Sequence, residues 1–242
     1  LGTPFATHNC EAFKVDLIHK QAQAIMQGTA CVVEEKLDGE RSLIHIANLP
    51  DGSRTVQLYS RKRNPRPKLR AVLEPYLLEA IPVGIDVILD GETIAWDDDE
   101  GCIVDFGKNM TYAEQQLQAR RRGQPEPSIR CMYRVFDVLY IRNWAAQPSL
   151  AGCITQLPLR LRRQFLVQLV GYRGVCPAEP PGGDWLTCPP GAPLPGKVEV
   201  NAIVQLSDAS SAATRWNTLR AQFQAVLDKG GEGLVVKSLN SQ

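Results

Sequence analysis

The sequence predicts an α+β fold in which helices flank antiparallel strands, and three observations support this prediction. Short runs rich in β-branched and aromatic residues are separated by turn signals. Other stretches have apolar residues at the three- and four-residue spacing of an amphipathic helix. The two kinds of stretch do not alternate regularly, as they would in a doubly wound fold. With 242 residues, 44% of them hydrophobic, the chain is long enough to bury a substantial core.

In the first quarter of the chain, one helix should precede three strands. Residues 14–27 have helical spacing and end at a glycine, which predicts a helix. ACVVEEKL (30–37) predicts a strand that runs into a loop at Asp38-Gly39. RSLIHIA (41–47) and TVQLYSR (55–61) predict two strands joined as a hairpin, because the segment between them contains Asp-Gly.

The middle of the chain should contain three helices and two strand regions. LRAVLEPYLLEA (69–80), MTYAEQQLQARRRG (110–123) and LPLRLRRQFLVQLV (157–170) predict helices, the last with leucines on one face and arginines on another. GIDVILDGETIAWD (84–97) is consistent with a strand pair or with one long bent strand. IRCMYRVFDVLYI (129–141) is the run richest in strand-forming residues.

The last quarter begins with an interruption. Residues 171–196 hold seven prolines and six glycines, which predicts a long surface loop inserted into the domain. KVEVNAIVQL (197–206) then predicts a strand. Residues 207–229 predict a helix whose apolar face includes Trp216 and Phe223, and EGLVVK (232–237) predicts a final strand.

Composition and absent motifs exclude several classes of protein. The net charge of +1 excludes a uniformly basic nucleic-acid binder, although it allows local basic patches such as RKRNPRPKLR (61–70). No apolar run approaches the roughly 18 residues of a membrane span, so we expect no association with a membrane. Neither a GxxxxGK[ST] phosphate loop nor a GxGxxG dinucleotide motif is present.

Lys36, in EEKLDGER (34–41), is the candidate nucleophile. A lysine amine attacks phosphorus or a carbonyl only when deprotonated, so it needs a site that lowers its pKa. Here a strand fixes the lysine backbone, Gly39 permits a tight loop close to a ligand, and Arg41 offers a planar fork of donors. The stretch alone is equally consistent with a hairpin turn carrying solvated charges.

Other predicted strands supply groups that a lysine nucleophile could use. Asp90 and Glu92 are two residues apart on one strand, so both should face the same side. Glu232 and Lys237 come from the last strand region, where Glu92 and Glu232 could hold Mg²⁺ while Lys237 screens a phosphate. Phe136 could stack on a purine, although an ordinary core phenylalanine is an equally good interpretation.

In this order, the motifs resemble those of the covalent nucleotidyltransferase superfamily: ATP-dependent DNA ligases, RNA ligases and mRNA capping enzymes. EKLDGER is similar to motif I, YSR to motif Ia, LDGE to motif III, YRVFDVLY to motif IIIa and EGLVVK to motif IV. Within the superfamily, EEKLDGER, FDVL and KVEV…LDKGGEGLVVK are most similar to the eukaryotic DNA ligase IV family of non-homologous end joining. The resemblance implies an ATP-grasp-like nucleotidyltransferase fold, with two antiparallel sheets, flanking helices and a nucleotide cleft between the sheets.

The resemblance also implies a role for each matching residue. Lys36 would attack the α-phosphate of ATP to give a lysyl-AMP, which then passes to the 5′-phosphate of a DNA break before the strand is sealed. The remaining implied contacts are Glu34 and Phe136 with the adenine, Leu37 with the nucleotide, Arg41 and Glu92 with the ribose, Arg61 and Lys237 with phosphates, and Glu92 and Glu232 with Mg²⁺.

The family pattern also sets expectations for the whole protein. It continues beyond motif IV to a Lys-x-Lys motif V and an OB-fold domain, which are not found by Gln242. We therefore expect residues 1–242 to be an adenylation domain truncated after motif IV that does not seal nicks alone. The implied partners are nicked or broken duplex DNA and an end-joining coiled-coil scaffold bound through regions outside this chain. The implied setting is DNA repair and recombination in the nucleus.

Two other functions use the same sequence features. An mRNA capping guanylyltransferase performs the same lysine chemistry with GTP. Alternatively, the chain could be a non-catalytic module that binds DNA or a protein partner and keeps these motifs only as scaffold. Comparing covalent labelling by ATP and by GTP separates the first alternative from a ligase, and a nucleotide adduct on Lys36 would exclude the second.

Overall fold

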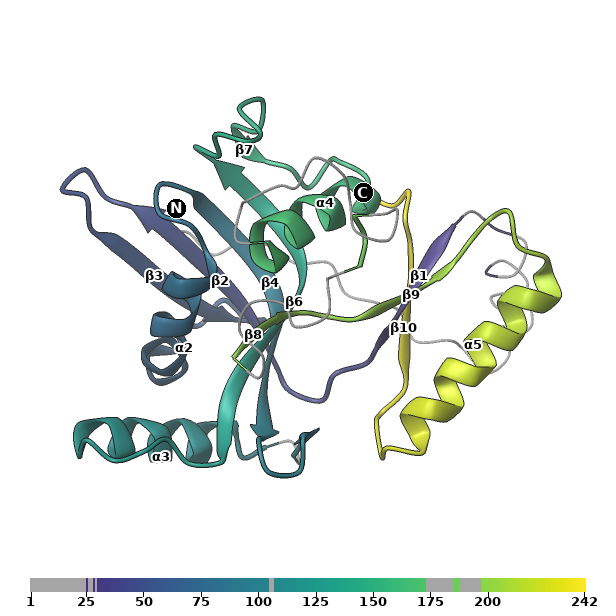
Figure 1. The fold of residues 1–242 in the computed structure, drawn as a ribbon. Helices are drawn as coiled ribbons and strands as arrows, with labels where there is room; N and C mark the ends of the chain where they lie inside the picture. The colour runs from purple at the N-terminus through teal and green to yellow at the C-terminus, as the bar shows by residue number, and fades with distance from the viewer. Residues whose placement is uncertain (1–24, 26–27, 29, 105–106, 173–184, 188–196) are drawn as a thin grey trace.

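The computed structural model describes residues 25, 28, 30–104, 107–172, 185–187 and 197–242. The strands form two sheets, which lie on either side of the centre of the molecule in Figure 1. The strands of the larger sheet are β2 (Glu40–Asn48), β3 (Arg54–Ser60), β4 (Asp86–Asp97), β5 (Cys102–Ile103), β6 (Ile129–Arg142), β7 (Gly152–Cys153) and β8 (Val198–Val200). Their order is β3-β2-β4-β6-β7, with β5 beside β4 and β8 beside β6.

The smaller sheet has three strands, β1 (Cys31–Glu35), β9 (Ile203–Leu206) and β10 (Leu234–Ser238), in the order β10-β1-β9. Both pairings of β1 are antiparallel, with Glu34 opposite Val235 on one side and Ile203 on the other. In the larger sheet, every pairing is antiparallel except that of β8 with β6. The predicted α+β class and the two antiparallel sheets are therefore confirmed, with one short parallel pair added.

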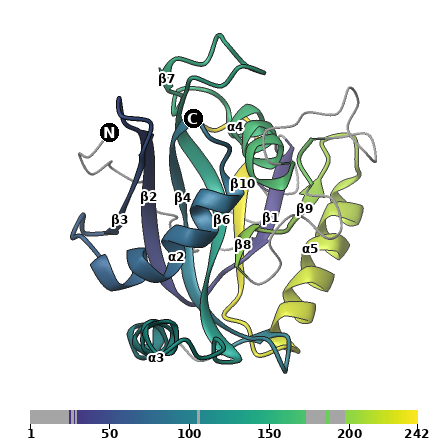
Figure 2. The same cartoon turned by 60° about the vertical axis from the view of Figure 1, so that its left-hand side comes forward.

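The helices cover the outer faces of the sheets. α2 (Pro67–Ala80) lies across the larger sheet in Figure 2, and α3 (Asn109–Arg121) packs beside it. α2 buries Leu69, Leu73 and Leu77 against apolar residues of β2, β3, β4 and β6, which forms the main core. α5 (Ala212–Leu227) contacts β9 and β10 of the smaller sheet.

α4 (Leu159–Leu166) continues into the π-helical turn η2 (Val167–Gly171) and touches both halves of the molecule. It packs on β6, and Leu159 also lies in a cluster with Val32 of β1 and Leu239. The backbone N–H of Leu159 donates to the carbonyl of Ser241, so the segment after β10 is fixed to this helix.

Two predicted features differ from the structure in their pattern of burial. The α4 helix was expected to place its arginines away from its leucines, but Arg162 and Arg163 are buried while Leu161 is 37% exposed. On α5, Trp216 and Phe223 of the predicted apolar face are about half exposed, and Arg215 is buried instead. Hydrogen bonds of Arg163 and Arg215 to backbone carbonyls, and of Arg162 to Asp137, account for the difference.

Two strand predictions are resolved by the structure. Residues 86–97 form one continuous strand, as in the second of the two alternatives for this segment. Its pairing with β6 is irregular between Ile88 and Gly91, where a long strand can bend. Residues 197–206 do not form one strand, because β8 joins the larger sheet and β9 the smaller. The predicted helix at 14–27 and most of the 171–196 loop lie outside the described residues. Among the helices that are described, none is long and apolar enough to cross a membrane.

Candidate functional site

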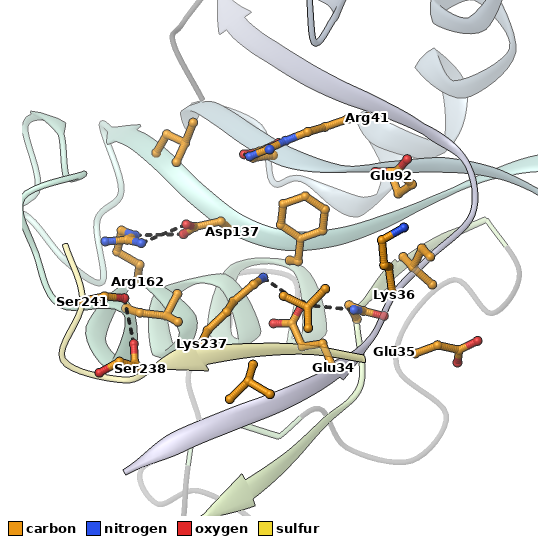
Figure 3. A pocket seen from close by; sticks show the side chains of 18 of the residues that line it. Glu34, Glu35, Lys36, Arg41, Glu92, Asp137, Arg162, Lys237, Ser238 and Ser241 are labelled. Carbon is orange, nitrogen blue, oxygen red and sulfur yellow. Dashed lines mark hydrogen bonds and ion pairs between the residues drawn. The ribbon is translucent and has the colours of Figure 1, made fainter. Parts of the chain in front are cut away.

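The described chain passes between the two sheets at two places, the loop 36–39 between β1 and β2 and the short link at Asn201 between β8 and β9. A cavity of about 560 Å³ lies where the sheets meet, with walls from both of them (Figure 3). That volume is within the usual range of small-molecule sites. Its lining includes Glu34, Lys36, Leu37, Arg41, Arg61, Asp90, Glu92, Phe136, Asp137, Arg162, Asn201 and Lys237.

Lys36 lies at the end of β1, directly where the chain leaves the smaller sheet. Alternation along the strand places Val32, Glu34 and Lys36 on one face, and this face borders the cavity. The Lys36 backbone N–H donates to the carbonyl of Gly233 at 2.8 Å, which holds the end of β1 against the start of β10. The Lys36 side chain is half exposed and forms an ion pair with Glu232.

Gly39 allows the crossing loop to pass close over β4. A Cβ atom at this position would lie 2.5 Å from the carbonyl oxygen of Thr93 and 2.8 Å from a side-chain carbon of Glu92. Real Cβ atoms do not approach other atoms so closely, so only glycine fits without movement of the backbone. The Asp-Gly step of the motif is therefore explained by packing between the Lys36 loop and the larger sheet.

Glu34 places a buried carboxylate in the cavity wall, and its side chain is only 4% exposed. Its Oε2 atom accepts a hydrogen bond from the Lys237 ammonium at 2.8 Å and another from the Asn201 amide at 3.2 Å (Figure 3). Because β1 and β10 are neighbours in register, Glu34 and Lys237 face the same side of the smaller sheet. These two donors compensate for the burial of the carboxylate.

On the opposite wall, Arg41 is held by Asp90. The guanidinium donates to both carboxylate oxygens, with Nε–Oδ1 3.0 Å and Nη2–Oδ2 2.6 Å. Burial raises the pKa of Asp90, and the charge and hydrogen bonds of Arg41 oppose that rise. The Phe136 ring lies between these walls, with the guanidinium of Arg41 5.4 Å and the ammonium of Lys237 4.5 Å from its centroid.

Glu92 has a strongly perturbed pKa. Burial raises it to about 8, and the Arg41 charge opposes this while Asp90 adds to it. A carboxyl group that is costly to ionise here would gain from a nearby cation. Glu92 and Glu232 both carry carboxylate oxygens, which are suitable ligands for Mg²⁺, and each interacts electrostatically with Lys36.

No cluster of three or more histidine, cysteine or acidic side chains suited to a metal occurs in the described part of the chain. Mg²⁺, however, is commonly held by one or two carboxylates together with substrate phosphates and water. The pair Glu92 and Glu232 fits that mode of binding, and it does not fit an all-protein metal cage.

The structure brings the sequence-predicted residues together. Lys36, Glu34, Leu37, Arg41, Arg61, Glu92, Phe136 and Lys237 all line the cavity. Glu232 does not line it but contacts the Lys36 amine from outside. Lys237, which is predicted to contact phosphate, forms a hydrogen bond with Glu34 and lies over the Phe136 ring in the structure.

Among the cavity residues that were not singled out from the sequence, two donate hydrogen bonds to carboxylates of the cavity wall. Arg162 of α4 donates to both oxygens of Asp137 at 2.9 Å, and Asn201 donates to Glu34. A signal for Arg162 was present, because Leu159, Arg162 and Leu166 share the helical spacing of a buried face. Asn201 gave no comparable signal, since a polar residue within a strand-like run does not reveal that the strand changes sheets there.

Comparison with known proteins agrees with this geometry. Residues 11–242 match the family model of the ATP dependent DNA ligase domain. The chain is 36% identical over 221 residues to DNA ligase 4 of Aspergillus fumigatus, and 29% identical over 223 residues to DNA ligase 4 of Coccidioides immitis. Each alignment covers 86% of this chain but only 18% of the relative.

Among solved structures, the ligase domain of LigD from M. tuberculosis is similar in fold. Its TM-score is 0.51 at 16% sequence identity, and the match covers 88% of this chain and 50% of that one. The nucleotidyltransferase fold expected from the motifs is thereby supported. Since the family model matches nearly the whole chain, the protein belongs to the ATP-dependent DNA ligase domain family.

Proposed function

We propose that this chain is the adenylation unit of an ATP-dependent DNA ligase of the ligase IV type, with Lys36 as the nucleophile. The observation that carries the proposal is the position of Lys36 at a cavity where Glu34, Arg41, Glu92 and Phe136 meet from both sheets. A lysine in a solvated turn would not explain this arrangement. The cavity offers places for a base, a ribose and a phosphate beside the Lys36 amine.

In the proposed reaction, the Lys36 amine attacks the α-phosphorus of ATP. A bond forms between Nζ and phosphorus, and the bond between phosphorus and the bridging oxygen of the β-phosphate breaks, releasing pyrophosphate. The amine must lose a proton before it attacks, and in the structure Nζ forms an ion pair with Glu232. Glu232 therefore has to turn away from Nζ, or accept its proton, before the attack.

The other residues bind and orient the nucleotide. Phe136 offers a ring for the purine to stack on, and the carboxylate of Glu34 can accept a hydrogen bond from the base. Arg41, held by Asp90, points a fixed charge toward the cavity, and Glu92 lies beside it for the ribose. Arg61 is exposed at the cavity rim, where a triphosphate would emerge.

Glu92 and Glu232 are the residues that would hold Mg²⁺. When bound there, the ion would screen the carboxylates from the phosphates and stabilise charge that develops during transfer. Holding the ion beside Lys36 also requires both carboxylates to be ionised. Burial raises the pKa of Glu92 even with the charges of Arg41 and Lys36 nearby, so a bound cation would further favour its ionisation.

The AMP group would then pass to the 5′-phosphate of a nicked or broken duplex, and a 3′-hydroxyl would displace it to join the strand. Similarity to DNA ligase 4 proteins supports a role in double-strand break repair by non-homologous end joining, in the nucleus. A coiled-coil scaffold partner, bound through regions outside this chain, belongs to the same proposal.

Covalent labelling tests the proposal. The full-length protein is incubated with α-labelled ATP or GTP and separated by denaturing electrophoresis, and the labelled residue is identified by peptide mass spectrometry. We expect label from ATP on Lys36, none in Lys36→Ala, and unchanged labelling in Lys108→Ala, which alters an exposed lysine outside the cavity.

Three results would contradict the proposal. Labelling that persists in Lys36→Ala would remove Lys36 as the nucleophile. Labelling by GTP in preference to ATP would favour the capping guanylyltransferase alternative, and no nucleotide adduct at all would favour a non-catalytic module.

A further inference from the structure

Asn201 occupies the link between β8 and β9, where the chain leaves one sheet for the other. It is 2% exposed, and three groups of this residue are hydrogen-bonded. Its backbone N–H donates to the carbonyl of Val135 at 2.7 Å, and its carbonyl accepts from the guanidinium of Arg163. Its side-chain amide donates to Oε2 of Glu34 at 3.2 Å.

These contacts connect the two recognition groups of the proposed nucleotide site. Val135 precedes Phe136 on β6 of the larger sheet, and Glu34 belongs to β1 of the smaller sheet. Asn201 bonds to the backbone beside the aromatic ring and to the carboxylate itself. Asn201 therefore helps to set the position of Glu34 relative to Phe136 across the sheet boundary, in addition to Lys237, which contacts both residues.

The two oxygens of Glu34 have different environments. Oε2 accepts hydrogen bonds from both Asn201 and Lys237, whereas Oε1 has no hydrogen-bond partner among the described residues. Because Glu34 lines the cavity, Oε1 is available to a ligand. A carboxylate oxygen accepts from the exocyclic amine at position 6 of adenine and repels the carbonyl oxygen at position 6 of guanine.

Asn201 and Lys237 both donate to Oε2 of Glu34. When a purine stacks on the face of Phe136 that Lys237 covers, only Asn201 can keep its hydrogen bond. The Lys237 ammonium lies 4.5 Å from the centroid of Phe136, in space that a stacked base on that side would take. Asn201 approaches Glu34 from the β8–β9 link and is held by its own backbone hydrogen bonds. It is thus the donor that can keep the carboxylate oriented in the nucleotide complex.

We propose that Asn201 is the positioning residue for base selection: it orients Glu34 so that Oε1 receives the 6-amino group of adenine over the Phe136 ring. The inference rests on the proposed function and deepens it, because it assigns the discrimination between adenine and other purines to a residue outside the recognised motifs. Arg163 supports the same link through the Asn201 carbonyl.

The test combines a change in the protein with a change in the nucleotide. Formation of the covalent adduct is followed by intact mass for the full-length protein with ATP, GTP or purine riboside triphosphate, which lacks the 6-amino group. For the wild type, we expect KM to be about tenfold or more higher with purine riboside triphosphate than with ATP, since a hydrogen bond to a charged group is lost. GTP should react more weakly still.

In Asn201→Ala, the KM for purine riboside triphosphate should be within about threefold of the KM for ATP. The maximal rate with ATP should change by less than about threefold. A purely structural role would raise both KM values together and leave their ratio unchanged. Asn109→Ala is the matched control, because Asn109 is also a buried asparagine whose amide donates to one carbonyl, that of Thr93. Its KM ratio should equal that of the wild type.

Asn201→Asp provides a second variant of nearly the same size, which replaces the amide donor with a carboxylate facing Glu34. It should also lose the preference for the 6-amino group, and it serves if the alanine variant does not fold. A wild-type KM ratio in the folded variants would overturn the role of Asn201 while leaving the proposed function intact. Failure of the wild type to form any adduct would instead refute the proposed function.

Discussion

The Lys237 ammonium lies 4.5 Å from the centroid of the Phe136 ring and donates a hydrogen bond to Glu34. A purine stacked on that side of the ring and the ammonium cannot occupy the same space. The other cation at the ring, Arg41, is fixed by two hydrogen bonds to Asp90. Nucleotide binding should therefore displace Lys237 and leave Arg41 in place.

Displacement of Lys237 predicts opposite effects on two ligands. In Lys237→Met, adenosine should bind a few-fold more tightly than in the wild type, because no ion pair has to be broken for the base to stack. ATP should bind about tenfold less tightly, because the displaced ammonium no longer reaches its phosphates. Isothermal titration calorimetry with both ligands measures this, and Lys108→Met should change neither affinity. Weaker adenosine binding in Lys237→Met would mean that Lys237 stays at the base.

Gly39 should not tolerate a side chain. In Gly39→Ala, the new Cβ would lie 2.5 Å from the Thr93 carbonyl oxygen, so the Lys36 loop has to move away from β4. We expect a loss of about 3 kcal/mol of stability by chemical denaturation and labelling slowed by more than about tenfold. Gly101→Ala is the control, since its left-handed φ of +65° costs only about 1 kcal/mol and its Cβ would meet open space.

The buried pair of Arg162 and Asp137 should be strongly coupled. Arg162→Met leaves the Asp137 carboxylate, only 15% exposed, without its two charged donors, so we expect a loss of about 3 kcal/mol. The double variant Arg162→Met/Asp137→Leu should lose at least about 1 kcal/mol less than the sum of the two single changes. Denaturant unfolding of the four proteins gives this coupling.

A solvent-exposed ion pair provides the comparison for that measurement. Lys68 and Glu114 pair on the surface with side chains about half exposed, so Lys68→Met should cost less than about 0.5 kcal/mol. Simple addition of the two single changes at Arg162 and Asp137 would contradict the coupling inferred from the structure.

Stability should fall in mild acid through His45. This residue is buried in β2 against the edge of Tyr59, and burial lowers the pKa of its imidazole from 6.5 to about 4. Between these values the unfolded chain takes up a proton that the folded chain does not, so acid favours unfolding by up to about 3 kcal/mol. Above pH 6.5 this contribution does not vary with pH.

Denaturant unfolding at pH 7 and pH 5 tests the role of His45. Other groups titrate in the same range, so the informative quantity is the difference between the wild type and His45→Gln. The non-titrating variant should lose less stability on acidification than the wild type. An equal loss in both proteins would show that His45 is not responsible.

Much of the site could be predicted because its residues lie in short ordered motifs. Glu34, Lys36 and Arg41 fall within eight positions, and strand alternation puts Glu34 and Lys36 on one face. The motif also predicted a tight loop at Gly39 close to a ligand, and the structure adds that this loop packs closely on β4. Local spacing, however, does not show which side chain pairs with each charged group, so the hydrogen bond from Lys237 to Glu34 could not be predicted.

The unpredicted parts depend on contacts between residues distant in sequence. KVEVNAIVQL has the pattern of one strand, and its division between two sheets at Asn201 is set by pairing with β6 and β1. Burial of Arg162 depends on Asp137, which is 25 residues earlier on a different element. The spacing of Leu159, Arg162 and Leu166 allows a buried arginine, but it does not identify the carboxylate with which the arginine pairs.

The pairing of β1 with both β9 and β10 also bears on how the protein folds. The contacts of Glu34 with Asn201 and Lys237 join residues 167 and 203 positions apart in the chain. Closing such long loops is entropically costly and slow, whereas the β2–β3 hairpin needs only a short turn. The smaller sheet should consequently assemble last. During synthesis, Lys36 emerges early but acquires the walls of its cavity only after β10 has been made.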